Sequence, residues 1–306
     1  ISTYDSGKGA VVTRGGAELL EHLGDPGSVS VVEFAKIPGC EMSPAKMAEL
    51  SRAVARELAR PDIAGAVVTH GTDTIEESAY FCHLTIASPK PLVFTGSMRT
   101  GSDLSWDGPR NLLDAITVAR FSRARGIGTM LVMNEEIHSA RFVTKTNGIF
   151  VGTFKSPACG AIGRVYLGEP WIFVIPALER QTVKPLIENR VATITAWSGD
   201  TESLTQALKR RDIKGLVIAG FGGGRVPLGW VKRLEKAAAK MPIVLASRTG
   251  AGAVDDPYGY GGAHFLRSIG LIAAHEMPVH KARIKLMLAL GNRLSGDRLK
   301  EFIENG

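Results

Sequence analysis

The sequence predicts an α/β protein in which a doubly wound, mostly parallel sheet domain is followed by a smaller α/β domain. Short apolar runs alternate with helical patterns through the first 135 residues or so. The alternation weakens between about 177 and 189 and then resumes. Strands alternating with helices are typical of a parallel sheet covered on both faces. We therefore expect a first domain over residues 1–180, a linker, and a second domain over residues 190–306.

The first domain begins with a polar, glycine-rich segment over residues 1–16, for which we predict a mobile chain. Ser43 and Pro44 indicate a helix start, since proline is favoured in the first helical turn. Residues 142–155 break the alternation and predict a loop or hairpin. The remaining elements expected here are helices over 17–23, 43–58, 75–82 and 111–124, and strands over 29–37, 63–68, 91–95 and 128–134, with the strand over 63–68 buried.

In the second domain the same alternation predicts a smaller sheet. Strands are expected over 191–196, 215–219 and 242–247, and helices over 201–210, 226–240 and 278–290, the last of them the final helix. A glycine-rich turn, 220–225, lies between a strand and a helix, which raises the hypothesis of an NAD-dependent oxidoreductase. The turn lacks the third glycine of a dinucleotide fingerprint, and no acidic residue ends the following strand. A packing or ligand-facing turn is the better interpretation.

Composition excludes several classes. The 306 residues are 44% hydrophobic, enough for a sizeable core, and no apolar run approaches the roughly 20 residues that span a bilayer. The net charge is +7, but the basic residues are dispersed, which indicates a solvated surface and no nucleic-acid partner. Three cysteines without CxxC, and seven histidines without HxH or HExxH, predict no disulfide framework and no metal. We expect a cytoplasmic or periplasmic protein, with the cytoplasm slightly favoured.

The best candidate for chemistry is the stretch directly after the strand over 63–68. The strand stops at His70-Gly71, and Thr72 and Asp73 then precede a helix. Open α/β sheets place ligands at the carboxyl ends of their strands, and a helix start offers free N–H groups to an anion. His70 fits either a catalytic role or a buried histidine bonded to backbone.

A threonine hydroxyl needs a base before it can act as a nucleophile. Lys145 can supply that base if burial lowers its pKa, and Asp73 can orient the pair or bind a substrate ammonium. The spacing alone does not show that Thr72 and Lys145 meet. A helix cap at residues 72–73 and a surface lysine at 145 therefore stay open as alternatives.

Residues 68–80, Val-Thr-His-Gly-Thr-Asp-Thr-Ile-Glu-Glu-Ser-Ala-Tyr, closely resemble the second signature of the bacterial-type L-asparaginases (asparaginase/glutaminase family). The segments 95–99, 107–112, 141–146 and 281–283 also fit, so the resemblance covers essentially the whole chain. It implies hydrolysis of a side-chain amide to a carboxylate and ammonia, without metal or cofactor. It also implies a homodimer or homotetramer with active sites near the subunit interface.

The resemblance gives roles to individual residues. Thr72 corresponds to the second active-site threonine of the family, activated with Lys145, and Asp73 to the group that binds the substrate α-amino group. Gly71 and Ser97 correspond to residues that lie along the bound substrate.

Three departures from the family pattern bear on substrate and mechanism. The Thr-Gly-Gly-Thr box of the family's first strand is absent, and Ile1-Ser2 resembles the residues that come directly after that box in the family. By the resemblance, the family's nucleophilic threonine would lie directly before Ile1. We therefore expect that the folded protein once contained this strand, as a lost segment or a separate peptide. Gly39, Cys40 and Glu41 form the turn that normally reads the substrate with Ser and Gln or Glu, and Arg225 falls near a partner-subunit asparagine. The alternative hypothesis is a catalytically silent homologue that binds an amino acid or small amide.

Overall fold

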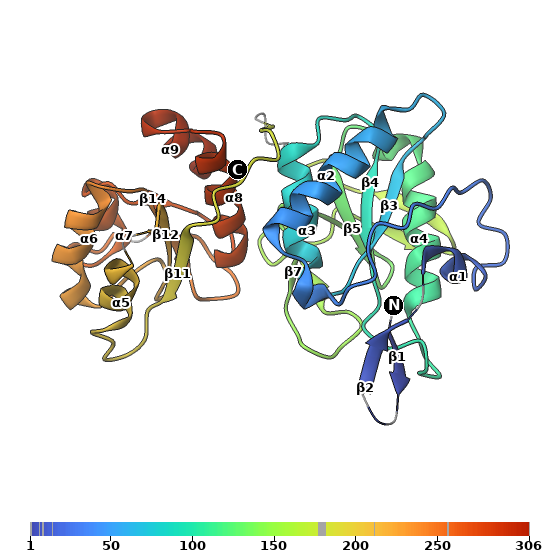
Figure 1. Cartoon of the computed structure of the whole chain (residues 1–306), viewed down its shortest axis with the longest axis horizontal. Coiled ribbons are helices and arrows are strands. Elements are labelled where there is room, and N and C mark those ends of the chain that lie inside the picture. Colours follow the sequence, from blue (N-terminus) through green and yellow to red (C-terminus); the bar gives the residue numbers. More distant parts are fainter. Residues whose placement is uncertain are drawn as a thin grey trace. The chain divides into compact units, whose positions relative to one another are not determined.

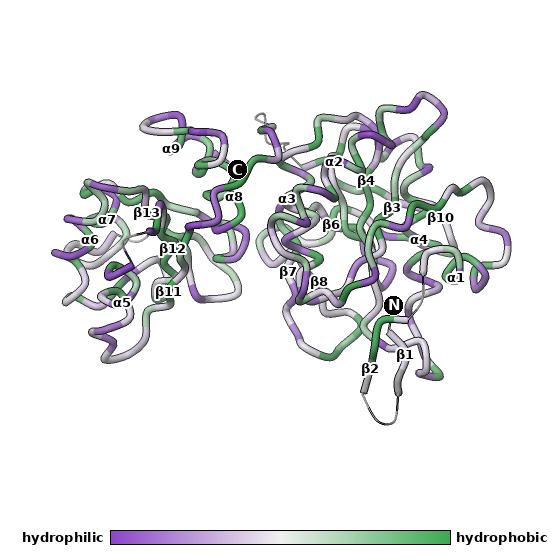
Figure 2. The backbone as a smooth tube through the Cα atoms, in the orientation of Figure 1, coloured by the Kyte–Doolittle hydropathy of each residue, from purple (hydrophilic) through white to green (hydrophobic). Residues whose placement is uncertain are grey.

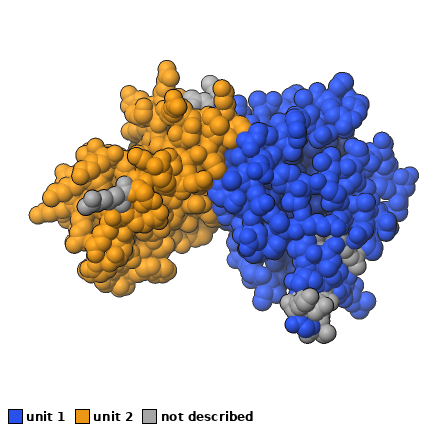
Figure 3. Space-filling model, in the orientation of Figure 1, with its two compact units in different colours: residues 1–182 blue, residues 183–306 orange. Residues whose placement is uncertain are grey.

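The computed structural model describes residues 2–5, 7, 9–13, 15–176, 182–210, 212–255 and 257–305. The chain divides into two compact units, Ile1–Thr182 and Val183–Gly306 (Figure 3), and each is described by itself. In the part of the chain that the structure describes, no helix combines the length and apolar character needed to cross a bilayer.

Unit 1 is built on a six-stranded sheet in the order β10-β9-β6-β5-β4-β3 (Figure 1). Its parallel part comprises β3 (Ala66–Thr69), β4 (Leu92–Thr95) and β5 (Thr129–Met133). An antiparallel extension comes next, made of β6 (Glu136–Ser139), β9 (Gly163–Tyr166) and β10 (Glu169–Ile172). The predicted α/β class, with parallel strands and covering helices, is confirmed.

Turn geometry explains why the direction of the strands changes after β5. Asn134 and Glu135, which join β5 to β6, have φ of 51° and 63°. Leu167 and Gly168, which join β9 to β10, have φ of 50° and 86°. Two successive residues with positive φ form the tight hairpin connection whose twist matches the strands it joins. These connections leave no room for a crossover helix, so the strands must run antiparallel.

Helices cover both faces of the parallel part (Figure 1). Helix α4 (Gly108–Arg120) packs Ala115 and Val118 against Val93, Met130 and Val132 of the strands. The other face carries α2 (Pro44–Ala59) and α3 (Ile75–Thr85), which are joined by a 2.7 Å hydrogen bond between the Ser51 and Thr85 hydroxyls. Residues alternate between the two faces of a strand, so β4 is buried along its whole length. The sheet thereby fixes the positions at which α3 and α4 begin.

Three expectations for unit 1 are wrong. Part of the segment predicted to be mobile forms a hairpin of β1 (Ser2–Asp5) and β2 (Gly9–Val12), which precedes α1 (Gly16–Leu20). Residues 29–37 are not a strand, because they pair with no strand among the described residues, and Val32 is 62% exposed. Strand β3 is half-buried rather than buried, since it lies at the edge of the described sheet. An apolar segment forms a buried strand only where other strands pair with it, and the apolar sequence alone does not determine that pairing.

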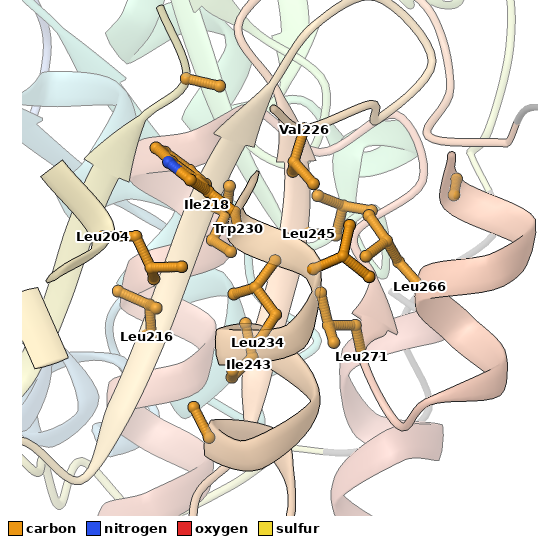
Figure 4. Packing of buried hydrophobic residues seen from close by; sticks show 14 of the residues in the cluster. Leu204, Leu216, Ile218, Val226, Trp230, Leu234, Ile243, Leu245, Leu266 and Leu271 are labelled. Carbon is orange, nitrogen blue, oxygen red and sulfur yellow. The ribbon is translucent and has the colours of Figure 1, made fainter. Parts of the chain in front are cut away.

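Unit 2 contains a four-stranded, fully parallel sheet. The strands are β11 (Val191–Thr195), β12 (Gly215–Gly220), β13 (Ile243–Ser247) and β14 (Ile272–Ala273). Helices α5 (Ser203–Lys209), α6 (Val231–Ala238) and α7 (Ala263–Ser268) cover one face, and α8 (Val279–Gly291) contacts the strands as well. Figure 2 shows apolar residues concentrated along these strands, and Figure 4 shows Trp230 beside Ile218 and Leu204 beside Leu216 within one buried cluster.

The sequence pattern missed α7, β14 and a further helix, α9 (Gly296–Glu304), so the helix over 278–290 is not the final one. Helix α7 and strand β14 are short, and short elements carry few repeats of a periodic pattern. Residues 177–181 of the expected linker lie outside the described residues. The rest of it, 182–189, forms no helix or strand.

A charged cluster beside β6 has a buried glutamate and a buried histidine at its centre. Glu136 is 6% exposed and pairs with Lys155 Nζ at 2.6 Å and Arg164 Nη2 at 2.7 Å. His138 is 1% exposed, with Nδ1 2.9 Å from the Ser156 hydroxyl and Nε2 3.4 Å from Glu136 Oε2. Desolvation lowers the pKa of His138 to about 4 from the ordinary 6.5, although Glu136 opposes the shift. His138 is therefore neutral at pH 7.

This lowered pKa predicts a loss of stability in mild acid. The unfolded chain takes up a proton at His138 near pH 6.5, whereas the folded chain does so only near pH 4. The contribution is present above pH 6.5 and is lost as the pH falls towards 4, by about 2–3 kcal/mol. Urea unfolding at pH 7 and pH 4.5 should show a larger loss for the wild type than for His138→Gln. Equal losses for both proteins would contradict the assignment to His138.

Candidate active site

Three loops of unit 1 meet at the carboxyl ends of β3 and β4. They are the 3-10 helix η1 (Gly39–Glu41), residues 70–74 after β3, and residues 96–98 after β4. A Cβ atom at Gly71 would lie 2.6 Å from Gly39 N, and one at Gly96 would lie 2.5 Å from His70 O and 3.4 Å from Thr72 Cγ2. Only glycine permits these backbone contacts. A Cβ atom at Gly39 would likewise lie 2.9 Å from Gly71 O, so these three glycines allow the loops to come together.

Replacing Gly71 by alanine should force the first two loops apart. The added Cβ meets backbone atoms of Gly39, which cannot rotate away, so we expect a loss of about 1–3 kcal/mol in the free energy of unfolding. Gly148→Ala is the matched control, because a Cβ there has no heavy atom within 4 Å. Denaturant unfolding of the two variants measures the difference. Equal stability of both variants would contradict the tight packing of these loops.

Thr72 and Lys145 meet in this place. A short hairpin of β7 (Thr144–Lys145) and β8 (Phe154–Lys155) carries the lysine. Lys145 Nζ lies 3.0 Å from Thr72 Oγ1 and 3.8 Å from Asp73 Oδ1. The lysine side chain is 19% exposed, while that of Asp73 is 58% exposed and accessible to a ligand. A lysine amine in its neutral form at this distance can accept the proton of the threonine hydroxyl.

The helix-cap alternative does not account for these side chains. Thr74, not Thr72 or Asp73, occupies the N-cap position of α3, and its side chain makes no capping hydrogen bond. The Thr74 hydroxyl instead donates to the Gly39 carbonyl at 2.6 Å, which ties the loop after β3 to η1. The side chain at the cap thus helps to assemble the site.

The His70 side chain links the loop after β3 to helix α3. Its Nδ1 lies 2.7 Å from the Gly71 carbonyl, which can only accept, so Nδ1 carries a hydrogen. Nε2 lies 2.9 Å from the Ser78 hydroxyl. Desolvation lowers the pKa of His70, against the opposing effects of the Gly71 carbonyl and Asp73. A neutral histidine with both nitrogens occupied by protein groups positions the loop, and its bond to backbone agrees with one of the two expectations, although the side chain is half-buried rather than buried.

Ser97 begins a second network. Asp107 accepts hydrogen bonds from the Ser97 hydroxyl at 2.8 Å and from the backbone N–H groups of Met98 at 3.0 Å and Arg99 at 2.9 Å. Asn111 Nδ2 donates to Asp107 Oδ2 at 2.9 Å and to the Gly96 carbonyl at 3.0 Å. Sequence reasoning did not name Asp107 or Asn111 as site residues. Their position at the start of a helix, one strand after Thr72, was the available signal.

The other predicted residues lie in two different places. Gly39 is buried against the loop after β3, while Cys40 and Glu41 are exposed on the same turn. Arg225 belongs to unit 2, where it is exposed on the turn after β12 with its guanidinium 4.4 Å above the Tyr258 ring. Across the described ranges, no three His, Cys, Asp or Glu side chains are arranged to hold a metal ion.

Unit 1 thus presents a hydroxyl–amine pair at the carboxyl edge of its sheet, an arrangement suited to amide hydrolysis. Residues 1–174 match the family model "Asparaginase, N-terminal", and residues 190–303 match "Glutaminase/Asparaginase C-terminal domain". The chain therefore belongs to the asparaginase family, as the signature at residues 68–80 predicted.

Individual relatives agree with this assignment. The chain is 34% identical over 298 residues to "L-asparaginase 2" of Bacillus subtilis, covering 94% of this chain and 77% of the relative. It is 37% identical over 276 residues to a "Probable L-asparaginase" of Deinococcus radiodurans, covering 88% and 84%. A solved structure of a "Probable Cytoplasmic L-asparaginase" from Campylobacter jejuni is similar with a TM-score of 0.87 and 30% identity, covering 95% of this chain and 94% of that one.

Proposed function

We propose that the protein hydrolyses the side-chain amide of asparagine, or of a related small amide, to a carboxylate and ammonia. The observation that carries the proposal is the 3.0 Å contact between Lys145 Nζ and Thr72 Oγ1. Both groups lie at the strand ends where open α/β sheets bind ligands. Membership of the asparaginase family supports the same reaction.

In the proposed mechanism Thr72 Oγ1 attacks the amide carbon while its proton passes to the amine of Lys145. The tetrahedral intermediate collapses when that proton moves to the departing nitrogen, which leaves as ammonia. Water then hydrolyses the threonine ester, and its proton restores the hydroxyl. The negative oxygen of each intermediate would be held by backbone and small polar groups near Gly71 and Ser97.

The surrounding residues determine which amide is held. We assign Asp73 to the substrate ammonium group, because its carboxylate is accessible and adjacent to Thr72. Gly39, Cys40 and Glu41 would contact the rest of the amino-acid moiety, since their turn packs on the same loop. We assign residues 1–180 to the catalytic domain and residues 190–306 to the smaller domain.

Arg225 lies outside unit 1, and we propose that it serves the site of another copy within a homodimer or homotetramer. An arginine fork can bind a carboxylate bidentately, which would favour a longer or differently charged amide. Sedimentation analysis of the purified protein tests the assembly, and a monomer with full activity would contradict it.

Ammonia release from asparagine, glutamine and a panel of small amides tests the reaction. A hydrolase releases ammonia from at least one of them at a rate that depends on enzyme concentration. A rise in melting temperature with asparagine but without ammonia would instead support the alternative, a silent homologue that binds an amino acid or small amide. An NAD-induced rise, which we do not expect, would point to an oxidoreductase.

A further inference from the structure

We propose that Glu76 is a positioning residue for Lys145, and that its carboxylate sets the distance between the lysine amine and the Thr72 hydroxyl. The inference rests on the proposed function for its effect on catalysis. Glu76 Oε2 accepts a 3.1 Å hydrogen bond from the backbone N–H of Lys145, 69 residues away in sequence. Glu76 is only 7% exposed, although it carries an acidic side chain.

The hairpin that carries Lys145 is very short. Strands β7 and β8 each contain two residues, and the turn between them is exposed from residue 146 to residue 150. The backbone N–H of Thr146 donates to the Thr153 carbonyl at 2.9 Å, so these residues form a hydrogen-bonded pair. In an antiparallel ladder the next pair, Lys145 with Phe154, is then not hydrogen-bonded, and the Lys145 N–H points away from β8. Glu76 supplies the acceptor that the neighbouring strand does not.

The backbone N–H and the side-chain amine of Lys145 are consequently both bonded to the same short segment, residues 72–76. Its amide N–H binds Glu76, and its Nζ binds the Thr72 hydroxyl four residues earlier. Glu76 lies in the first turn of α3, which begins directly after the loop that contains Thr72. A shift of the hairpin relative to α3 would therefore lengthen the Nζ to Oγ1 distance directly. Catalysis by a positioned base is sensitive to displacements of about 1 Å.

Glu76 also differs from Asp73 in whether its carboxylate is accessible to substrate. The Asp73 side chain is 58% exposed, whereas Glu76 is buried and bonded to protein backbone. Substrate can contact the first residue but not the second. We therefore expect replacement of Glu76 to lower kcat and to leave KM almost unchanged.

The test compares three single variants with the wild type. Glu76→Ala removes the acceptor, Glu76→Gln keeps an acceptor oxygen and removes the charge, and Glu77→Gln removes the same charge from the neighbouring residue of the same helix turn. We expect Glu76→Ala to lower kcat about 10- to 100-fold with KM within threefold. Glu76→Gln and Glu77→Gln should stay within about threefold of the wild type in both parameters.

Hydrogen exchange, measured by mass spectrometry of the peptides that span residue 145, gives a second result that does not depend on activity. Exchange of this segment should be faster in Glu76→Ala and unchanged in the two Gln variants. The proposal is overturned if Glu76→Ala matches the wild type in kcat or in exchange. It is also overturned if Glu76→Gln loses as much activity as Glu76→Ala while its segment around residue 145 still exchanges slowly. That result would show that the negative charge of Glu76 matters for activity and that the position of Lys145 does not. An inactive wild type with the expected exchange pattern would reject the proposed function and retain the positioning role.

Discussion

Lys145→Met is expected to lower kcat for amide hydrolysis by about 10²- to 10⁴-fold, the usual contribution of a positioned general base. The lysine amine lies 3.0 Å from the Thr72 hydroxyl, and methionine preserves most of the side-chain volume without any proton acceptor of comparable strength. The substrate ammonium is assigned to Asp73, so KM should change much less than kcat. Steady-state measurement of ammonia release gives both parameters.

Lys232→Met provides the control, because it removes an exposed lysine of α6 in unit 2. Its kcat should equal that of the wild type. Melting curves of both variants show whether the fold is retained. Wild-type kcat in a folded Lys145→Met protein would rule out Lys145 as the base.

Thr72→Val should reduce kcat at least as strongly, by about 10³-fold or more, because loss of a nucleophile removes the covalent step itself. Valine has nearly the shape of threonine, so the packing of the Thr72 methyl against the loop at Gly96 is retained. Thr72→Ser keeps the hydroxyl and should retain much of the activity. The comparison separates the hydroxyl from the side-chain volume.

The double variant Thr72→Val/Lys145→Met distinguishes a cooperating pair from two independent groups. Residues that act in one proton transfer are strongly non-additive, so the double variant should be about as slow as the slower single variant. Additive losses would show that the lysine acts on some other group. Residual hydrolysis at the wild-type rate in Thr72→Val would place the nucleophile elsewhere.

Most regular elements of unit 1 were predictable because their signals are local. Helix α2 starts where the Ser-Pro pattern predicted, and the Ser43 Oγ caps it by accepting a hydrogen bond from the Lys46 N–H at 3.3 Å. The loop or hairpin expected over 142–155 is confirmed as β7 and β8. The antiparallel extension was not predicted, because Asn134-Glu135 and Leu167-Gly168 are not standard hairpin sequences. Only their positive φ angles in the structure identify them as hairpin turns. Residues 29–37 have the composition of a strand, but a strand also needs a neighbour.

The residues of the candidate site also fall into those that the sequence predicted and those that only the structure identified. The local pattern placed Thr72 and Asp73 after a strand and before a helix, and a resemblance to the asparaginases selected Lys145. Sequence reasoning did not find Glu76, Asp107 or Asn111, because each acts through a bond to a residue that local spacing does not relate to it. Asn111 Oδ1, for example, accepts from the backbone of Asn134 at 2.9 Å, 23 residues along the chain.

The sequence by itself determined the class of fold, the order of most elements and the residues with the right chemistry, because periodicity, capping and turn preferences operate over a few residues. Only the tertiary structure decided that Lys145 meets Thr72 across 73 residues. The loops around that contact touch because their glycines lack Cβ atoms, and the buried Glu76 accepts a hydrogen bond from the backbone of Lys145. Long-range contacts of this kind depend on the packing of the whole unit, which no short window of sequence contains.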